Sequence, residues 1–96
     1  MFESAIHKMT KELKPIYNHQ RSFYGKAYMF YDAETHRFYL ISYDTVVASI
    51  DRYAVLHRHW WGCSRTTMNH VREFCKQLIH RDYFITAQEW RELPVE

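Results

Sequence analysis

The sequence has few of the residues that mark linkers, disulfide scaffolds and membrane spans. Its 96 residues include 2 Gly, 2 Pro and 2 Cys. So little glycine and proline argues against a linker or a low-complexity segment, and two cysteines are too few for the disulfide framework of a small secreted domain. No apolar run reaches the ~18–20 residues that cross a bilayer, and the first residues lack the basic and apolar regions of a signal peptide. We therefore expect a single domain over residues 1–96, located in a cytoplasm, with reduced thiols and no membrane contact.

Strong charge of either sign is also absent. The formal net charge is +2 with histidine neutral. This value is too small for a protein that binds nucleic acid mainly by charge, and it has the wrong sign for an acidic mimic of DNA. The sequence has no P-loop, no dinucleotide-binding glycine motif and no HExxH zinc motif, and a domain of this size offers little depth for a pocket that excludes water. We therefore expect no enzymatic activity and no cofactor.

Aromatic residues, in contrast, are abundant. The chain has 8 Tyr, 6 Phe and 3 Trp, which make up 18% of the sequence. A small core cannot easily hide so many large rings, and exposed Tyr and Trp are typical of interfaces. We expect Trp60, Trp61 and Tyr28 to lie on a surface that binds a host protein, or a second copy of this chain across an open sheet face.

Hydrophobic periodicity predicts helices near both ends of the chain and strands between them. Three segments fit helices: residues 2–14, ended by Pro15; the main helix, from a cap at Ser64 or Thr66 to Ile79; and a short helix that follows the capping box of Thr86 and Glu89 and ends at Pro94. Three segments rich in strand formers fit strands: residues 22–31, 37–50 and 53–61.

The connections between these strands predict the fold class. The polar residues 32–36 have the length of a hairpin loop, and imperfect alternation at residues 42–45 indicates a bulge or bend. Short connections imply antiparallel neighbours. We therefore expect an α+β fold, in which a three-stranded antiparallel meander is packed by the main C-terminal helix, with short N- and C-terminal helices.

Four sequence blocks resemble an uncharacterised family of small proteins from phages and mobile elements of Gram-positive bacteria. They are residues 21–27 (RSFYGKA), 41–48 (ISYDTVVA), 61–67 (WGCSRTT) and 70–77 (HVREFCKQ). The chain departs from the family pattern in a more basic, histidine-rich segment between Ile50 and Trp61, and in Cys75, where the family usually has leucine. The family has no assigned catalytic residues, so the resemblance implies a context, that of a mobile element, rather than a chemistry. Turn and cap chemistry explains most of the residue types in these blocks.

Two further patterns are candidate sites. His57, His59, Cys63 and His70 are residue types that bind zinc, and Cys63 near a histidine is also a candidate nucleophile, but their spacing matches no standard zinc finger or catalytic motif. The second pattern is a polar, mostly basic stripe on the main helix, formed by Arg65, Asn69, Arg72 and Lys76. Such a stripe could contact phosphates or an acidic protein surface, although charged rows on helices are more often simply solvated.

Together these features predict a non-enzymatic accessory protein of a phage or mobile element. We expect it to bind a host protein or ribonucleoprotein, and an inhibitor of a defence nuclease, such as an anti-CRISPR protein, is the most concrete version. The first alternative is a small regulator that binds nucleic acid, whose affinity would fall steeply with salt. The second is a metal-dependent hydrolase that uses the histidine and cysteine group.

Overall fold

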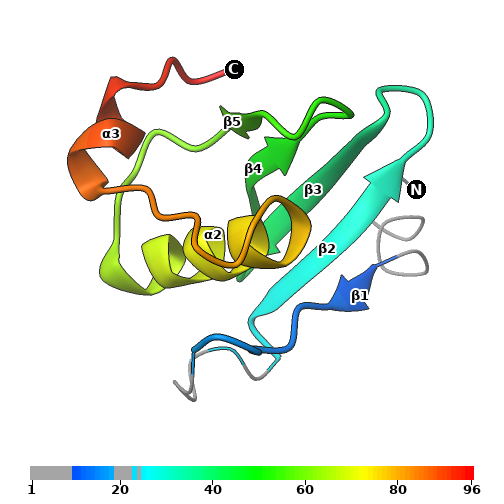
Figure 1. Ribbon diagram of the computed structural model, residues 1–96, viewed down its shortest axis with the longest axis horizontal. Coiled ribbons are helices and arrows are strands. Elements are labelled where there is room, and N and C mark those ends of the chain that lie inside the picture. The colour runs from blue at the N-terminus through cyan, green and yellow to red at the C-terminus, as the bar shows by residue number, and fades with distance from the viewer. Residues whose placement is uncertain (1–9, 19–22, 24) are drawn as a thin grey trace.

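The computed structural model describes residues 10–18, 23 and 25–96 (Figure 1). The elements follow in the order β1 (Lys11–Glu12), β2 (Ala27–Asp32), β3 (Arg37–Ser42), β4 (Thr45–Ile50), β5 (Leu56–Arg58), α2 (Arg65–Leu78) and α3 (Ala87–Glu92). The fold class is α+β, as expected, with an antiparallel sheet and two helices in the part of the chain that the structure describes.

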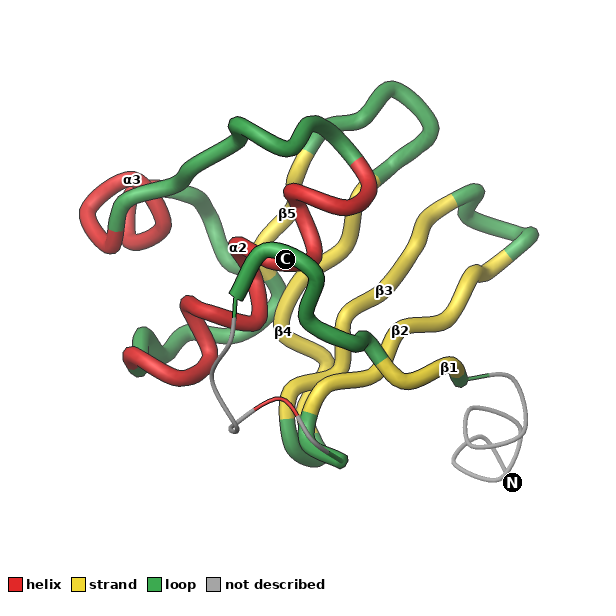
Figure 2. The backbone as a smooth tube through the Cα atoms, turned by 60° about the horizontal axis from the view of Figure 1, so that its bottom comes forward, coloured by secondary structure: helices red, strands yellow, loops and turns green. Residues whose placement is uncertain are grey.

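The sheet has five strands, so the expected count of three is wrong. The strands lie side by side in chain order, each antiparallel to its neighbours (Figure 2). One additional strand comes from the segment expected to be the first helix, and the other arises because residues 37–50 form two strands. The segment 53–61 contributes only Leu56–Arg58.

The helix expected over residues 2–14 is wrong where the structure describes it, and residues 1–9 lie outside the described part. Lys11 pairs with Met29 and Glu12 with Tyr28 at the edge of the sheet. Leu13 then enters the core, and its N–H donates to the carbonyl of Ala27 at 2.9 Å. A short apolar stripe fits a helix or a strand equally well, and here pairing with β2 decides between them.

A two-residue turn separates β3 from β4. Ser42 pairs with Thr45, and Tyr43 between them has a φ of 58°. Two-residue hairpin turns favour positive φ because it matches the twist of the strands. The bulge or bend expected at residues 42–45 is therefore a reverse turn, and the register shift of this strand pair lies between Leu40 and Ile41.

Both helices that the structure describes begin where their caps predict. Ser64 Oγ accepts the Thr67 N–H at 3.1 Å and caps α2. Thr86 and Glu89 form the capping box of α3, with both reciprocal hydrogen bonds present. The hydrogen bonds from Thr86 lower the pKa of Glu89. Local cap chemistry therefore sets both helix starts, as the sequence predicts.

The two faces of the sheet have different environments. The helix α2 lies across one face, where its apolar stripe joins Leu40, Ala48 and Ile50 in the core (Figure 1). Side chains alternate along a strand, so the neighbours of these residues point to the opposite side, which we call the outer face. Its members include Tyr28, Phe30, Arg37, Tyr39, Ser49 and His57. None of the helices within the described ranges is long and apolar enough to span a bilayer.

Candidate functional site

The blocks that carry the family resemblance meet in a buried polar cluster. Ser42 Oγ lies 2.8 Å from His70 Nδ1 and 3.2 Å from Thr67 Oγ1. The edge of the Phe23 ring packs on His70 at 4.7 Å between centroids. His70 is fully buried and Ser42 is 3% exposed. Because these hydrogen bonds are shielded from water, the cluster joins β3 to α2 and specifies their relative position rather than presenting a nucleophile to a substrate.

The candidate metal ligands are separated by the sheet. His57 lies on the outer face and His59 follows it on the same side, whereas His70 is buried between α2 and the other face. Cys63 lies in the loop before α2 and packs against the core. Across the described residues, no group of three or more His, Cys, Asp or Glu side chains could hold a metal ion. His57 and His59 share a side because side chains alternate along a strand, whereas His70 belongs to α2, which covers the opposite face of the sheet.

His57 instead lies between two carboxylates on the outer face. Its Nε2 is 2.8 Å from Asp51 Oδ2, and its Nδ1 is 2.5 Å from Glu96 Oε2. Arg37 Nη1 donates to Glu96 Oε1 at 3.2 Å. The pKa values of Asp51 and Glu96 are both lowered, chiefly by the hydrogen bond that each carboxylate forms with His57. The hydrogen bond and the charge of Arg37 lower the pKa of Glu96 further. This charged group holds the 94–96 segment against the sheet.

The half-buried His59 forms a hydrogen-bonded pair with the buried Ser49. Its Nε2 lies 2.7 Å from Ser49 Oγ, and Arg37 Nη1 donates to the same oxygen at 3.2 Å. Ser49 has no exposed surface, so its hydroxyl cannot reach a substrate. Burial lowers the pKa of His59, and the nearby Glu96 opposes this shift only in part. The pair is therefore a structural contact between β4 and the end of β5.

The lowered pKa of His59 predicts that acid destabilises the fold. The pKa of His59 in the folded protein lies below its ordinary value of 6.5, so the fold favours the neutral ring. The stability that the neutral ring contributes is complete above pH 6.5 and is lost as the pH falls through the lowered pKa. We expect the free energy of unfolding to decrease between about pH 7 and pH 5, and to decrease less in His59→Gln. Urea unfolding at several pH values across this range measures the free energy of unfolding. The variant His80→Gln, which changes an exposed histidine, is the control. Equal pH slopes for wild type and His59→Gln would contradict the prediction.

Two side chains of the polar stripe on α2 form hydrogen bonds within the protein. Arg72 Nε donates to the carbonyl of Ile85 at 2.8 Å, and its guanidinium lies 4.4 Å from the centre of the Phe84 ring. Lys76 Nζ donates to the carbonyl of Arg81 at 3.1 Å. These bonds fasten the connection between α2 and α3 to the helix. Asn69 is half-buried and Arg65 is exposed, so the stripe is not a uniform row of solvated cations.

The three aromatic residues expected at an interface have different surroundings. Trp61 is 78% exposed in the loop between β5 and α2. Trp60 packs against the core and lies so close to Gly62 that a Cβ atom there would fall 2.3 Å from the indole. Tyr28 is half-buried on the outer face. Trp61 is thus the exposed member of the set, and Trp60 has a packing role.

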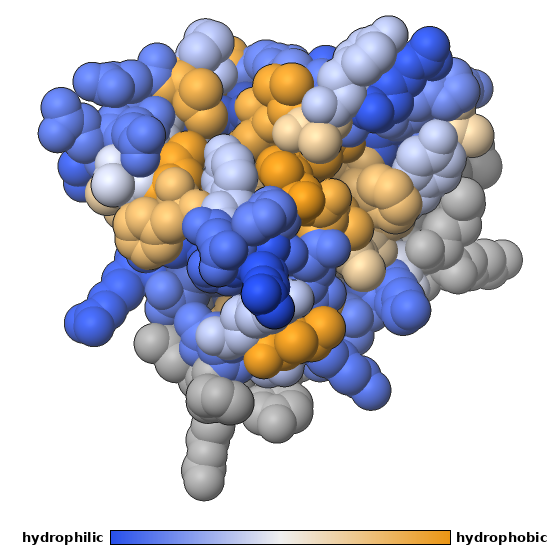
Figure 3. Space-filling model, viewed as in Figure 1, coloured by the Kyte–Doolittle hydropathy of each residue, from blue (hydrophilic) through white to orange (hydrophobic). Residues whose placement is uncertain are grey.

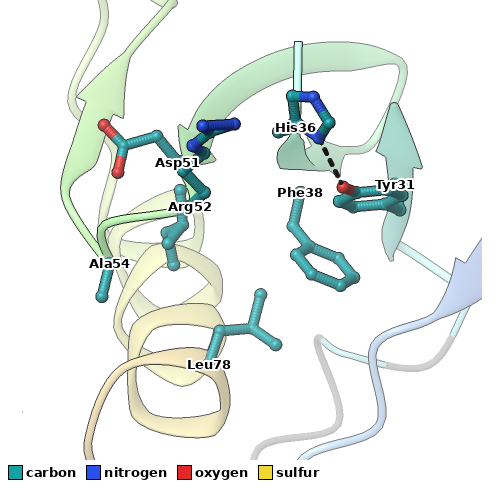
Figure 4. Close-up of a pocket in the computed structure, with 8 residues that line it drawn as sticks. Tyr31, His36, Phe38, Asp51, Arg52, Ala54 and Leu78 are labelled. Carbon is teal, nitrogen blue, oxygen red and sulfur yellow. Dashed lines mark hydrogen bonds between the residues drawn. The ribbon is translucent and has the colours of Figure 1, made fainter. Parts of the chain in front are cut away.

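A groove that the sequence did not reveal lies between the β2–β3 hairpin and the C-terminal end of α2. Figure 4 shows the side chains that line it: Tyr31, His36, Phe38, Ile50, Asp51, Arg52, Ala54 and Leu78. Its volume is about 320 Å³. The rings of Tyr31 and Phe38 pack 4.8 Å apart and remain 41% and 37% exposed. Apolar walls with a few polar groups are typical of binding pockets.

The length of α2 explains why this groove is open. Phe38 lies on the helix-side face, two residues from the buried Leu40, but α2 ends at Leu78. The end of the hairpin therefore extends past the helix, and its aromatic residues have no helical cover. Figure 3 shows apolar side chains gathered at the centre of this side of the molecule. Only the strand register places Tyr31 opposite Phe38 and brings both to the helix end.

The family match covers most of the chain. A model of a family of unknown function, DUF8033, matches residues 11–92. The chain belongs to this family. The match to DUF8033 includes every residue that lines the groove and the buried polar cluster, whereas Glu96 lies outside it. Neither a curated protein nor a solved structure matches the chain.

Proposed function

We propose that this protein acts by binding a partner protein through the groove between the β2–β3 hairpin and α2. The observation that carries the proposal is a groove of mixed lining in which the partly exposed rings of Tyr31 and Phe38 form the apolar wall. The adjoining turn extends this surface with Tyr53 and Val55, which are 75% and 50% exposed. Aromatic residues around a pocket are the usual anchors of protein interfaces. A side chain of the partner would fill the groove.

The proposed role involves no chemical step by the protein. The hydroxyls of the two serine–histidine pairs, Ser42 with His70 and Ser49 with His59, are buried. Burial also raises the pKa of Cys75 to about 12, so its thiol stays protonated and unreactive. These two hydroxyls and the Cys75 thiol are therefore engaged in the packing of the fold, whereas the Cys63 thiol is partly exposed in the loop before α2.

The family resemblance supports a biological setting for this binding. Because the sequence blocks resemble a family of phages and mobile elements, the partner we propose is a host protein in the bacterial cytoplasm, with a defence nuclease as the most concrete candidate. The net charge of +2 disfavours mimicry of DNA. Occupying a protein surface through apolar contacts fits the composition better than competing with nucleic acid for a basic cleft.

A matched pair of phenylalanine variants tests the proposal. Phe38 is 37% exposed in the groove, and Phe84 is 58% exposed beside Arg72. The partner is first captured from a host lysate with the wild-type protein, in stoichiometric amount and after nuclease treatment. We expect this partner to bind Phe38→Ser at least about tenfold more weakly, because truncation of an anchor residue at an interface costs about 2 kcal/mol or more of binding free energy. Phe84→Ser should bind as the wild type does. Affinity is measured by calorimetry with the recovered partner, and circular dichroism verifies folding.

Three results would contradict this function. Equal affinity of Phe38→Ser and wild type would exclude the groove as the binding site. Capture that disappears with nuclease, together with a steep salt dependence, would favour the alternative of a nucleic-acid-binding regulator. A metal found in the purified protein, with hydrolytic activity that depends on it, would favour the alternative of a metal-dependent hydrolase.

A further inference from the structure

A second surface, on the outer face and the β5 edge, is already occupied by a segment of the same chain. After α3 the chain returns to the sheet, and Val95 forms a parallel bridge with Arg58. The Glu96 N–H donates to the Arg58 carbonyl at 2.8 Å. The 94–96 segment thus pairs with the free edge of β5, in the position that a sixth strand would take.

The Glu96 side chain is held by groups from two strands. Arg37 of β3 donates to one carboxylate oxygen at 3.2 Å, and His57 of β5 contacts the other at 2.5 Å. Both receiving side chains are largely shielded, with 23% and 19% of their surfaces exposed. Ser49 and Asp51 fix the positions of Arg37 and His57 from the far side. Two oriented donors that converge on one carboxylate make a specific acid-binding site. We call Arg37 and His57 the carboxylate receptor.

The occupying segment has little to hold it besides this contact. Pro94 and Glu96 are exposed, and Val95 is 48% exposed. One bridge, a main-chain contact of Glu96 with His59, one ion-paired side chain and a half-buried valine make a small set of contacts, which gives a low cost of local opening. An extended peptide that pairs along β5 and presents a carboxylate to the same receptor would form more main-chain hydrogen bonds than the 94–96 segment does.

We propose that the β5 edge and the carboxylate receptor bind an extended acidic segment of a partner protein, and that residues 94–96 occupy this site until the partner displaces them. The chemistry of the segment in place defines the partner: strand conformation, with a glutamate or aspartate directed at Arg37 and His57. This surface adjoins the groove through Asp51, which lines the groove and contacts His57, but the proposal does not depend on the function proposed for the groove.

The test uses a fluorescein-labelled peptide of about eight residues in which threonine and glutamate alternate. Fluorescence anisotropy measures its binding to the full chain, to a variant that ends at Leu93, and to full-length Glu96→Gln. We expect both variants to bind at least about fivefold more tightly than the full chain, because the competing segment is removed or weakened. The matched peptide with glutamine in place of glutamate should bind about tenfold more weakly, because it cannot form charge-assisted hydrogen bonds.

Point variants in the shortened chain locate the binding. Arg37→Gln should lose most of the affinity for the acidic peptide, and Arg81→Gln, which removes an exposed charge elsewhere, should keep it. Amide chemical shifts should change along β5. The proposal would be overturned if neither the shortened chain nor Glu96→Gln bound the peptide, if the two peptides bound equally, or if the amide shifts of β5 stayed unchanged. A full-length dimer that becomes monomeric on truncation would assign the edge to a second copy of this chain and would also overturn it.

Discussion

Replacing Arg58 by methionine is expected to lower the free energy of unfolding by about 3–5 kcal/mol, because a network around a buried charge is lost. Arg58 is 6% exposed. Its guanidinium donates to five main-chain carbonyls, those of Trp60, Trp61, Trp90, Arg91 and Leu93. The last three lie at the C-terminal end of α3 and its C-cap Leu93, where carbonyls lack the main-chain partners of a helix interior, although the Trp90 carbonyl also accepts the Leu93 N–H. One side chain therefore ties α3 to the loop that leads into α2.

Methionine would fill much of the same space but would donate no hydrogen bond. The five carbonyls would lose this donor, with the Trp90 carbonyl keeping only the Leu93 N–H, and the contact between the guanidinium and the Trp90 ring, at 5.2 Å, would also be lost. Urea unfolding monitored by circular dichroism gives the midpoint and the slope for Arg58→Met. The exposed Arg81→Met is the control and should change stability by no more than about 0.5 kcal/mol. A loss below about 1 kcal/mol for Arg58→Met would refute the proposed role of this network.

Replacing Glu73 by alanine has the second largest expected effect, a loss of about 2–4 kcal/mol. Glu73 is 1% exposed on the buried side of α2. Its carboxylate accepts the N–H groups of Ile16 and Tyr17 at 3.0 and 3.1 Å and the side-chain amide of Gln77 at 2.6 Å. It therefore satisfies main-chain donors of the connection that follows β1 and fixes that connection to the helix.

Alanine would remove the acceptor that the N–H groups of Ile16 and Tyr17 share and would leave a gap on the buried side of α2, whereas the Gln77 amide keeps its bond to the Lys14 carbonyl. Glu73→Gln keeps one acceptor oxygen and should lose less stability than Glu73→Ala. The exposed Glu92→Ala on α3 is the control, since its side chain makes only a long contact, 3.5 Å, with Gln88. Hydrogen exchange should also quicken at the amides of Ile16 and Tyr17. Unchanged exchange at these two amides in Glu73→Ala would contradict the anchoring role.

The helices were predictable because their signals are local. The apolar stripe from Met68 to Leu78 repeats with the helical period. The cap at Ser64 needs no tertiary contact, because its side chain bonds to an N–H only three residues away. The capping box of Thr86 and Glu89 is equally local. The presence of strand-forming segments between the helices was predictable from composition for the same reason.

The sites depended on contacts between residues that are distant in sequence. Arg37 and Glu96 meet only because the chain returns to the β5 edge after α3, and no spacing rule connects residues 59 positions apart. The groove likewise depends on where α2 ends relative to the β2–β3 hairpin. His70 was a candidate metal ligand by residue type, and its burial beside Ser42 could be recognised only once the helix was placed on the sheet.

By itself, the sequence determined the α+β class, the two helix starts and a surplus of aromatic rings beyond what a small core can hold. These properties follow from periodicity, capping and composition, which act over a few residues or need no geometry at all. The tertiary structure alone decided the five-stranded register, the groove beside α2 and the carboxylate receptor on the outer face. Each of these requires the relative placement of separate elements, and that placement is set by the packing of the whole core rather than by any one segment.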